Sequence, residues 1–175
     1  PTTEKPSTEE PTTETPDQRV TLTAKNTVVT VPSVTYTGKA QKPAVKVTVS
    51  GKALSTDDYS VAYSNNKNAG IAKVVITGKG NYTGKVESTF VIKKASQTIQ
   101  KQTVYAYSKY VMVKASAKGK ITYTSSNKKV ATVNKKSGFV TAKKPGKVQI
   151  KVTAAATANY KKSTGTITLI VVPAT

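Results

Sequence analysis

The stretch Val148-Gln149-Ile150-Lys151-Val152-Thr153 places an apolar side chain at every second position and a polar one between them. Successive side chains of a β-strand point to opposite faces, so this pattern predicts a strand with one buried and one wet face. The same alternation returns in Ile167–Val171 and, earlier in the chain, in Val45–Val49, Tyr59–Tyr63 and Ala72–Ile76. No amphipathic helix competes with these segments. They predict an all-β protein built mainly of antiparallel strands.

Turn-forming residues separate the predicted strands at about the spacing of a β-sandwich. Glycine and asparagine accept the positive φ angles that tight hairpins require. The turns are Thr37-Gly38-Lys39, Ser50-Gly51-Lys52, Ser64-Asn65-Asn66, Gly78-Lys79-Gly80-Asn81, Ser126-Asn127-Lys128, Lys136-Ser137-Gly138 and Lys144-Pro145-Gly146. We therefore predict two tandem β-sandwich modules, at residues 18–95 and 96–175.

A repeated dipeptide supports this division. Asn81-Tyr82 precedes the last apolar strand of the first module, and Asn159-Tyr160 precedes that of the second, 78 residues later. Each tyrosine either tucks its ring under its sandwich and hydrogen-bonds a loop, or is an ordinary amphipathic turn residue. Only a few residues around Lys94–Gln97 separate the apolar runs of the two modules. So short a junction restricts the angle between them and predicts a rod.

Residues 1–17, PTTEKPSTEEPTTETPD, differ in composition from the rest of the chain. Proline recurs every five residues, and the segment has no aromatic side chain. It cannot bury enough apolar surface to offset the entropy of ordering, so we expect a disordered Pro/Thr/Glu-rich linker that acts as a semi-rigid spacer. Such linkers resemble those joining modules of bacterial cell-wall and secreted proteins. Because the sequence starts at Pro1, we expect it to be an internal piece of a longer protein.

The composition leaves little room for catalysis. The chain contains no His, Cys or Trp, so the commonest general base, thiolate chemistry and disulfides are missing. The second module has no carboxylate side chain, and the first has only Asp57, Asp58 and Glu87. We expect the two aspartates to form a turn before the strand at Tyr59. We therefore predict no catalytic, cofactor-binding or metal-binding residues and no enzyme activity, and no apolar run reaches the roughly 18 residues of a membrane span.

Four blocks of the second module follow one another in a characteristic order. They are Ile121-Thr122-Tyr123-Thr124-Ser125-Ser126-Asn127, Val130-Ala131-Thr132-Val133, Gly138-Phe139-Val140-Thr141-Ala142 and Pro145–Val152. This order resembles the bacterial Ig-like group 2 domain, and the resemblance covers residues 97–172. Tyr123 stands where that family often has tryptophan, and we interpret it as a core residue. The resemblance implies an Ig-like β-sandwich and offers no catalytic residue.

Five blocks of the first module also form a pattern. They are Tyr36–Ala40, Asp58-Tyr59, Asn66–Gly70, Gly80–Gly84 and Phe90–Ile92. The pattern, within residues 33–93, resembles the Ig-like, MBG-type repeats found beside group 2 domains in surface proteins of Gram-positive gut bacteria. Both resemblances imply an extracellular string of Ig-like modules at the cell surface or in the cell wall.

Our leading hypothesis is a non-catalytic stalk or spacer of a bacterial cell-surface or secreted multidomain protein, either an adhesin or a wall-associated enzyme. The spacer, the short junction and the missing site chemistry motivate it. Its partners would be neighbouring domains of the same polypeptide, and we expect the fragment to be a monomer without cofactors.

A cluster of tyrosines supports a second hypothesis, a carbohydrate-, glycan- or mucin-binding module. Tyr105, Tyr107 and Tyr110 are close in sequence, and on a strand Tyr105 and Tyr107 share a face. Exposed aromatic rings stack on sugar rings, and the phenol adds a hydrogen-bonding group. The alternative is that one or more of these rings fills the core. The other large residues available for that core are Phe90, Phe139 and Met112.

The net charge of +20 is unevenly distributed. Residues 1–17 hold five acids and one base, residues 18–95 hold twelve bases and three acids, and residues 96–175 hold fifteen lysines and no acid. Only Arg19 among the 28 bases is an arginine. Lysine lacks the planar fork that reads phosphates and base edges, so the composition argues against specific nucleic-acid recognition.

Three lysine pairs, Lys128-Lys129, Lys135-Lys136 and Lys143-Lys144, lie on successive turns of the second module. If they gather at one end they could meet teichoic acid, another anionic cell-wall polymer, a sulfated glycan or another polyanion; otherwise they only keep the turns soluble. We expect the second module to bind polyanions more strongly than the first. Retention on immobilised heparin or teichoic acid should fall steeply from low to moderate salt, because screening acts within about 8 Å at physiological ionic strength. Retention that survives high salt, or selects one polyanion, would contradict this expectation.

Overall fold

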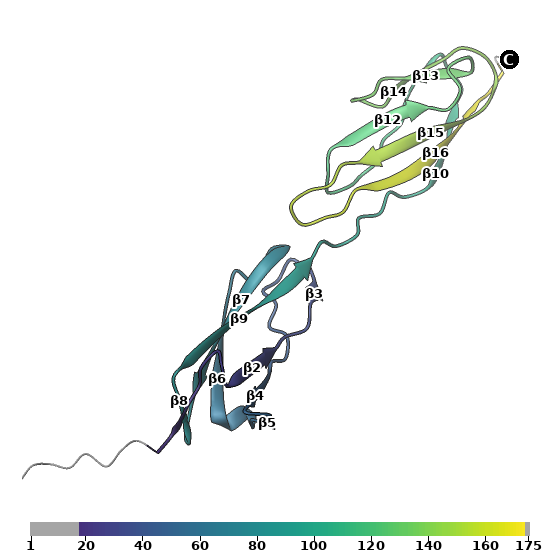
Figure 1. Cartoon of the computed structure of the whole chain (residues 1–175). Coiled ribbons are helices and arrows are strands. Elements are labelled where there is room, and N and C mark those ends of the chain that lie inside the picture. The colour runs from purple at the N-terminus through teal and green to yellow at the C-terminus, as the bar shows by residue number, and fades with distance from the viewer. Residues whose placement is uncertain (1–17, 174–175) are drawn as a thin grey trace, which may run out of the picture.

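The structure, a computed structural model, describes residues 18–173; the predicted linker at residues 1–17 lies outside them. The described part is almost entirely β-strand, with one 3₁₀ turn as its only helical element. That part contains no helix long and apolar enough to cross a membrane. The prediction of an all-β fold with two tandem sandwiches is confirmed (Figure 1).

The strands divide between the two modules in chain order. The first module contains β1 (Val20–Thr21), β2 (Thr27–Thr30), β3 (Val34–Thr35), β4 (Lys46–Val49), β5 (Lys52–Ala53), η1 (Thr56–Asp58), β6 (Tyr59–Ser64), β7 (Gly70–Gly78), β8 (Tyr82–Thr83) and β9 (Lys85–Lys93). The second module contains β10 (Gln102–Ala106), β11 (Tyr110–Met112), β12 (Ile121–Ser125), β13 (Ala131–Val133), β14 (Phe139–Ala142), β15 (Gly146–Ala154) and β16 (Ser163–Val171).

Each module packs a four-stranded sheet against a three-stranded one. In the first module these are β3-β9-β7-β6 and β2-β4-β5, with β1 and β8 forming a separate two-stranded sheet. In the second they are β10-β16-β15-β12 and β11-β14-β13. In both four-stranded sheets the last strand lies between its antiparallel hairpin partner and an early, parallel strand. This parallel pairing spans five residue pairs in β10–β16 and two in β3–β9.

A glycine opens the long hairpin of each module in the same way. Gly70 begins β7 opposite Ile92, and Gly146 begins β15 opposite Val171. Their φ angles are 142° and 145°, values that side-chain-bearing residues rarely adopt. The early parallel strand meets the same Ile92 or Val171 from the other side. The two ends that carry these glycines therefore share one backbone plan.

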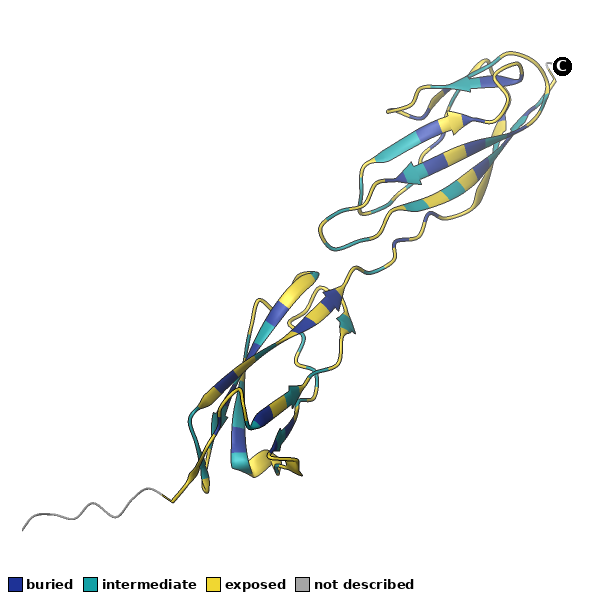
Figure 2. Cartoon of the chain, viewed as in Figure 1, coloured by how far each residue is buried: buried dark blue, intermediate teal, exposed yellow. Residues whose placement is uncertain are grey.

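Alternating side chains fill the interior, as predicted (Figure 2). In the second module they form one continuous cluster with a contribution from every strand. Its β15 and β16 members are Val148, Ile150, Val152, Ala154, Ile167, Leu169 and Val171. The core of the first module is divided into two clusters, around Ile76 and around Phe90, which share the half-buried Val29, Val45 and Val61.

The large residues proposed for the core are not all there. Phe90 is buried at 3% exposure, but Phe139 and Met112 are 42% and 43% exposed. These two face each other across β11 and β14, and their neighbours Val111 and Val140 take the inward positions instead. Placing Phe139 and Met112 in the core was therefore wrong, because in both strands the alternate residues face the core.

Tyr123 is a core residue, as predicted. It is 6% exposed, and its hydroxyl accepts a hydrogen bond from the N–H of Ala115 at 3.1 Å. Two residues on, the buried Ser125 hydroxyl donates to the carbonyl of Ala131 at 2.7 Å and accepts from the N–H of Asn127. Side-chain bonds of this kind replace ladder bonds where a strand stops. The Ser-Ser-Asn block thus ends β12 and anchors the start of β13.

Gly138 provides a test of this packing. Its φ is 75°, and an added Cβ would lie 2.3 Å from the carbonyl oxygen of Val113 and 3.1 Å from the Tyr123 ring. Gly51 has a similar φ of 83° but open space around it. Gly51→Ala should cost about 1–2 kcal/mol of backbone strain, whereas Gly138→Ala adds a steric clash to that strain.

Calorimetry would compare the two variants. A change of 1 kcal/mol in stability moves the Tm of a domain this size by roughly 4–8 °C. Gly51→Ala should therefore lower the Tm of the first module by several degrees. Gly138→Ala should lower the Tm of the second module by at least twice as much, or prevent that module from folding. Equal shifts would mean that the close approach to Val113 does not constrain the fold.

Candidate functional site

Tyr105 and Tyr107 present exposed rings at the end of the edge strand β10. Tyr105 is 51% and Tyr107 is 79% exposed, and their ring centroids lie 6.2 Å apart with planes inclined by 21°. The two rings share a face, as expected for residues two apart on a strand. The alternative that they fill the core is wrong, because Ala106 and Val104 take the inward positions.

Tyr110 does not join them. It lies on β11, in the other sheet, where it stacks on Phe139 at 5.6 Å with ring planes inclined by 24°. The Nζ atom of Lys109 lies 5.5 Å from the centre of the Tyr110 ring. The outer faces of two packed sheets point in opposite directions. The predicted three-tyrosine platform therefore separates into a Tyr105–Tyr107 pair and a Tyr110–Phe139 pair.

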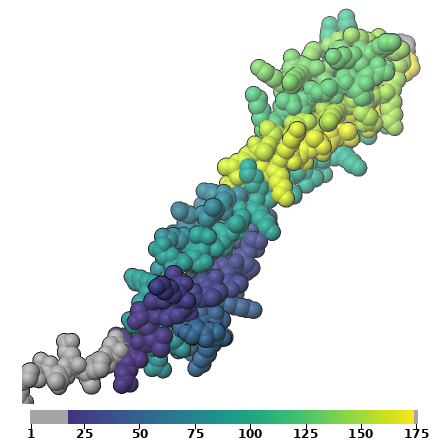
Figure 3. All heavy atoms as spheres, in the orientation of Figure 1, coloured from purple at the N-terminus to yellow at the C-terminus, as the bar shows by residue number. Residues whose placement is uncertain are grey.

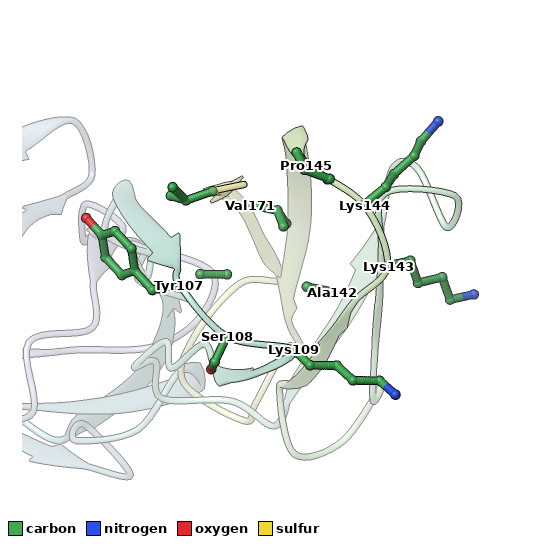
Figure 4. A pocket seen from close by; sticks show the side chains of 10 residues that line it. Tyr107, Ser108, Lys109, Ala142, Lys143, Lys144, Pro145 and Val171 are labelled. Atoms are coloured by element: carbon green, nitrogen blue, oxygen red, sulfur yellow. The ribbon is translucent and has the colours of Figure 1, made fainter. Parts of the chain in front are cut away.

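A pocket of about 170 Å³ lies beside Tyr107 at the far end of the second module (Figure 4). Lys109, Lys143 and Lys144 contribute to its lining, and Figure 4 shows their side chains extending to one side and the Tyr107 ring to the other. Pro145 completes the turn between the lysines and β15. The pocket therefore has lysine side chains on one side and an aromatic ring on the other.

The lysine turns predicted from the sequence are neighbours. The N–H groups of Lys143 and Lys144 donate to the carbonyl of Val130 at 2.8 and 3.3 Å, which holds their turn beside the Lys128-Lys129 turn. Lys128 and Lys135 line a common pocket of about 360 Å³. The arrangement concentrates positive charge on these turns.

The carboxylates of the first module have structural partners. Asp58 accepts a hydrogen bond from the N–H of Ser55 at 3.0 Å, and the Ser55 hydroxyl accepts one from the N–H of Asp57, a reciprocal cap of η1. The predicted turn before β6 is thus confirmed. Glu87 pairs with Lys73 at 2.6 Å on the outer face of the sheet. Within residues 18–173, no group of three or more acidic side chains could hold a metal ion.

The modules meet end to end at Ala95 (Figure 3). Its N–H donates to the carbonyl of Asn159 at 2.9 Å, and its carbonyl accepts from the N–H of Lys161 at 2.8 Å. The preceding Lys94 donates its ammonium to the carbonyl of Thr157 at 2.6 Å. The connecting segment is therefore bonded to the loop between β15 and β16 as soon as β9 ends.

Side chains also cross the junction. The amide oxygen of Asn159 accepts from the N–H of Ala69 at 2.8 Å, and its amide nitrogen donates to Asn68 at 3.2 Å. The ring of Tyr160 packs edge-on against Tyr36, with centroids 5.5 Å apart and planes at 82°. Tyr160 lies at the junction end of its own sandwich, where it lines a shallow pocket with Ser116 and Lys118, and its ring also contacts the first module.

Gln97 fixes the next part of the junction, and the sequence analysis missed it. It is 8% exposed, and its amide nitrogen donates to the carbonyls of Ala155 and Lys161 at 2.9 and 2.7 Å. Its amide oxygen accepts from both N–H groups of Lys118-Gly119 at 3.0 Å. One signal in the sequence could have found it. Gln97 lies two residues before the apolar Ile99, and residues two apart in an extended segment point to the same side, here inward.

The first module receives its own preceding chain in the same manner. Val20 donates to the carbonyl of Asn81 at 2.9 Å, as Ala95 does to Asn159. Both contacts belong to parallel pairings with the Asn-Tyr dipeptide. Tyr82 packs against the core of its own module, unlike its counterpart at the junction. The Asn-Tyr repeat therefore marks the point at which each sandwich bonds the incoming chain.

Known proteins resemble the chain only distantly over its whole length. None of the curated proteins matches it. Among solved structures, Drosophila N-cadherin EC1-4 is 12% identical over 81% of this chain and 48% of that chain, with a TM-score of 0.34. Domains 4 and 5 of the S-layer protein SbsC are 15% identical over 84% of this chain and 98% of that chain, with a TM-score of 0.34.

A SusE-like surface located polysaccharide binding protein from the heparin utilisation locus of Bacteroides thetaiotaomicron is 11% identical over 83% of this chain and 34% of that chain, with a TM-score of 0.28. The chain spans about half the length of the first solved structures it matches, which are cadherins and a protocadherin.

The family comparison is more specific. Residues 88–165 match the bacterial Ig-like domain (group 2). The match starts within β9 and ends within β16, slightly earlier than the resemblance at residues 97–172, and it contains all four sequence blocks. The bacterial Ig-like domain (group 2) is therefore the family that residues 88–165 match, a segment that contains most of the second module.

Proposed function

We propose that this chain is part of a stalk that holds another domain of the same polypeptide away from a bacterial cell surface or wall. In this proposal residues 1–17 are a Pro/Thr/Glu-rich linker, residues 18–95 and 96–175 are two structural modules, and none of them is catalytic. The neighbouring domain would be adhesive or enzymatic, and the chain itself would be monomeric. The group 2 family and the Pro/Thr/Glu-rich linker support an extracellular position, of the kind found in Gram-positive bacteria.

The observation that carries the proposal is the junction. Four of the five residues from the end of β9 to Gln97 are bonded: Lys93 accepts from Tyr36, and Lys94, Ala95 and Gln97 all bond the second module. So short a connection, bonded to both sides, supports a restricted angle between the two sandwiches. Because the early and last strands are parallel, the chain also enters each sandwich at one end and leaves at the other.

The stalk proposal predicts one preferred spacing between the modules. The chain has no cysteine, so spin labels at Lys52→Cys and Lys129→Cys would occupy only those exposed positions. Electron-electron distance measurements should give a narrow distribution. Asn159→Ala combined with Tyr160→Ala removes the contacts to Asn68, Ala69 and Tyr36, and should broaden it.

The matched control is Asn134→Ala combined with Tyr107→Ala, the same residue types far from the junction, which should leave the distribution narrow. A broad distribution in the unmodified chain would argue against a stalk. So would an unchanged distribution in the Asn159/Tyr160 variant, because the side-chain contacts would then contribute nothing to the alignment.

The stacked Tyr105–Tyr107 pair favours a second function, binding of a glycan such as mucin. Both rings are exposed and nearly parallel, and the adjoining pocket carries lysines. An exposed aromatic ring can accept the apolar face of a sugar ring, while the amines attract acidic substituents.

Affinity electrophoresis through gels with mucin, starch or bacterial cell-wall polysaccharide tests this function. Tyr105→Ala and Tyr107→Ala should each weaken retention by about tenfold, the upper range for the loss of one aromatic contact. Tyr110→Ala is the matched control, since that ring lies on the other sheet, and it should have no effect. Equal losses in all three variants, or none in the first two, would exclude this surface.

A further inference from the structure

We propose that tension along the chain unfolds the first module before the second, so that the stalk yields in two stages. This inference deepens the stalk proposal and rests on it for its biological role, because a spacer held at both ends carries any pulling force. It follows from how the first and last strands of each module are paired, and from the number of residue pairs in these pairings.

In the second module the first strand pairs directly with the last. β10 and β16 are parallel and in register over five residue pairs, from Gln102 opposite Ile167 to Ala106 opposite Val171. Beyond them, the N–H of Val172 donates to the carbonyl of Ala106 at 3.0 Å. Pulling the ends of two parallel neighbours apart slides one along the other. All the bonds between them are then loaded together and must break together.

In the first module the force meets weaker pairings one after another. β1 pairs with β8 over only two residue pairs, through the N–H groups of Val20 and Leu22. Behind β1, the next parallel contact is β3 on β9, which again has two residue pairs. Its one additional bond is from the N–H of Tyr36 to the carbonyl of Lys93 at 2.9 Å. These two short pairings are loaded in succession, so neither shares its load with the other.

Burial reinforces the difference. Both residues of β1 are exposed, Val20 at 45%, so water can replace the hydrogen bond of Val20 as it stretches and leaves only the bond of the buried Leu22 protected. Ala106 of β10 is 2% exposed and Val104 packs against the core, which shields the longer pairing. The core behind β10 is one continuous cluster, whereas that of the first module is divided. Forced unfolding follows the unfolding rate, which these features lower in the second module.

Single-molecule stretching of the full chain, held at its two termini, tests the order. Two steps are expected at different forces, the first module yielding at the lower one and releasing about 250 Å of extended chain. The variant Thr21→Cys with Thr83→Cys joins β1 to β8 at residues that lie opposite each other. In its oxidised form the lower-force step should shorten by about 200 Å, and reduction should restore it.

A second variant tests why the other module resists. Ala106 bonds β16 through its carbonyl, and Val104 has the same orientation on β10, whereas the N–H of Thr103 faces away from β16. Val104→Pro should therefore lower the force of the later step and raise its unfolding rate by about fivefold for each bond lost. Val104→Ala controls for lost packing and Thr103→Pro for the proline ring; both should retain most of the force.

Three results would overturn the inference: a single unfolding step, shortening of the higher-force step by the oxidised cysteine pair, or equal weakening by Val104→Pro and Thr103→Pro. If Val104→Pro does not fold, the oxidised and reduced cysteine variant still decides the order. The order does not depend on the angle between the modules. A chain that bends at the junction but unfolds in this order would therefore disprove the stalk alone.

Discussion

The pairing of the last strand with an early, parallel strand is the constraint on which the rest of this structure depends. β9 and β16 are each held on one side by their hairpin partner and on the other by β3 or β10. A parallel neighbour begins at the same end of the sheet as the strand it pairs with. The chain therefore enters each sandwich at one end and leaves it at the other, as Figure 1 shows. An end-to-end junction at Ala95 follows directly, and the mechanical difference between the modules has the same origin.

Period-two alternation was enough to predict the fold class, the long hairpins and most of the buried positions. It failed where both parities of a short strand carry apolar groups, as in Phe139-Val140, because the pattern identifies the two faces without saying which one meets the other sheet. It also could not anticipate the contact of Tyr160 with Tyr36, since the two residues belong to different modules. Gln97 was missed because its hydrogen-bond partners come from two distant loops.

The candidate site was predictable in the same partial way. The shared face of Tyr105 and Tyr107 follows from their spacing on one strand, and their exposure follows from the small Ala106 that packs inward between them. Tyr110 separated from them because the chain changes sheets after Tyr107, a step that no local pattern reveals. The charge distribution, by contrast, was readable without any structure, since lysines on turns are exposed wherever the strands pack.

Because of Pro145, the far end of the second module differs from the corresponding end of the first module, which contacts the second module at the junction. Gly146 pairs with Val171 as Gly70 pairs with Ile92, so the residues before the two glycines, Pro145 and Ala69, occupy equivalent positions. Ala69 gives its N–H to Asn159, and proline has none to give. A second copy of this Ig-like domain could not follow the first with the same contacts. The two modules are therefore not interchangeable units, and their order along the polypeptide is part of the information that the sequence encodes.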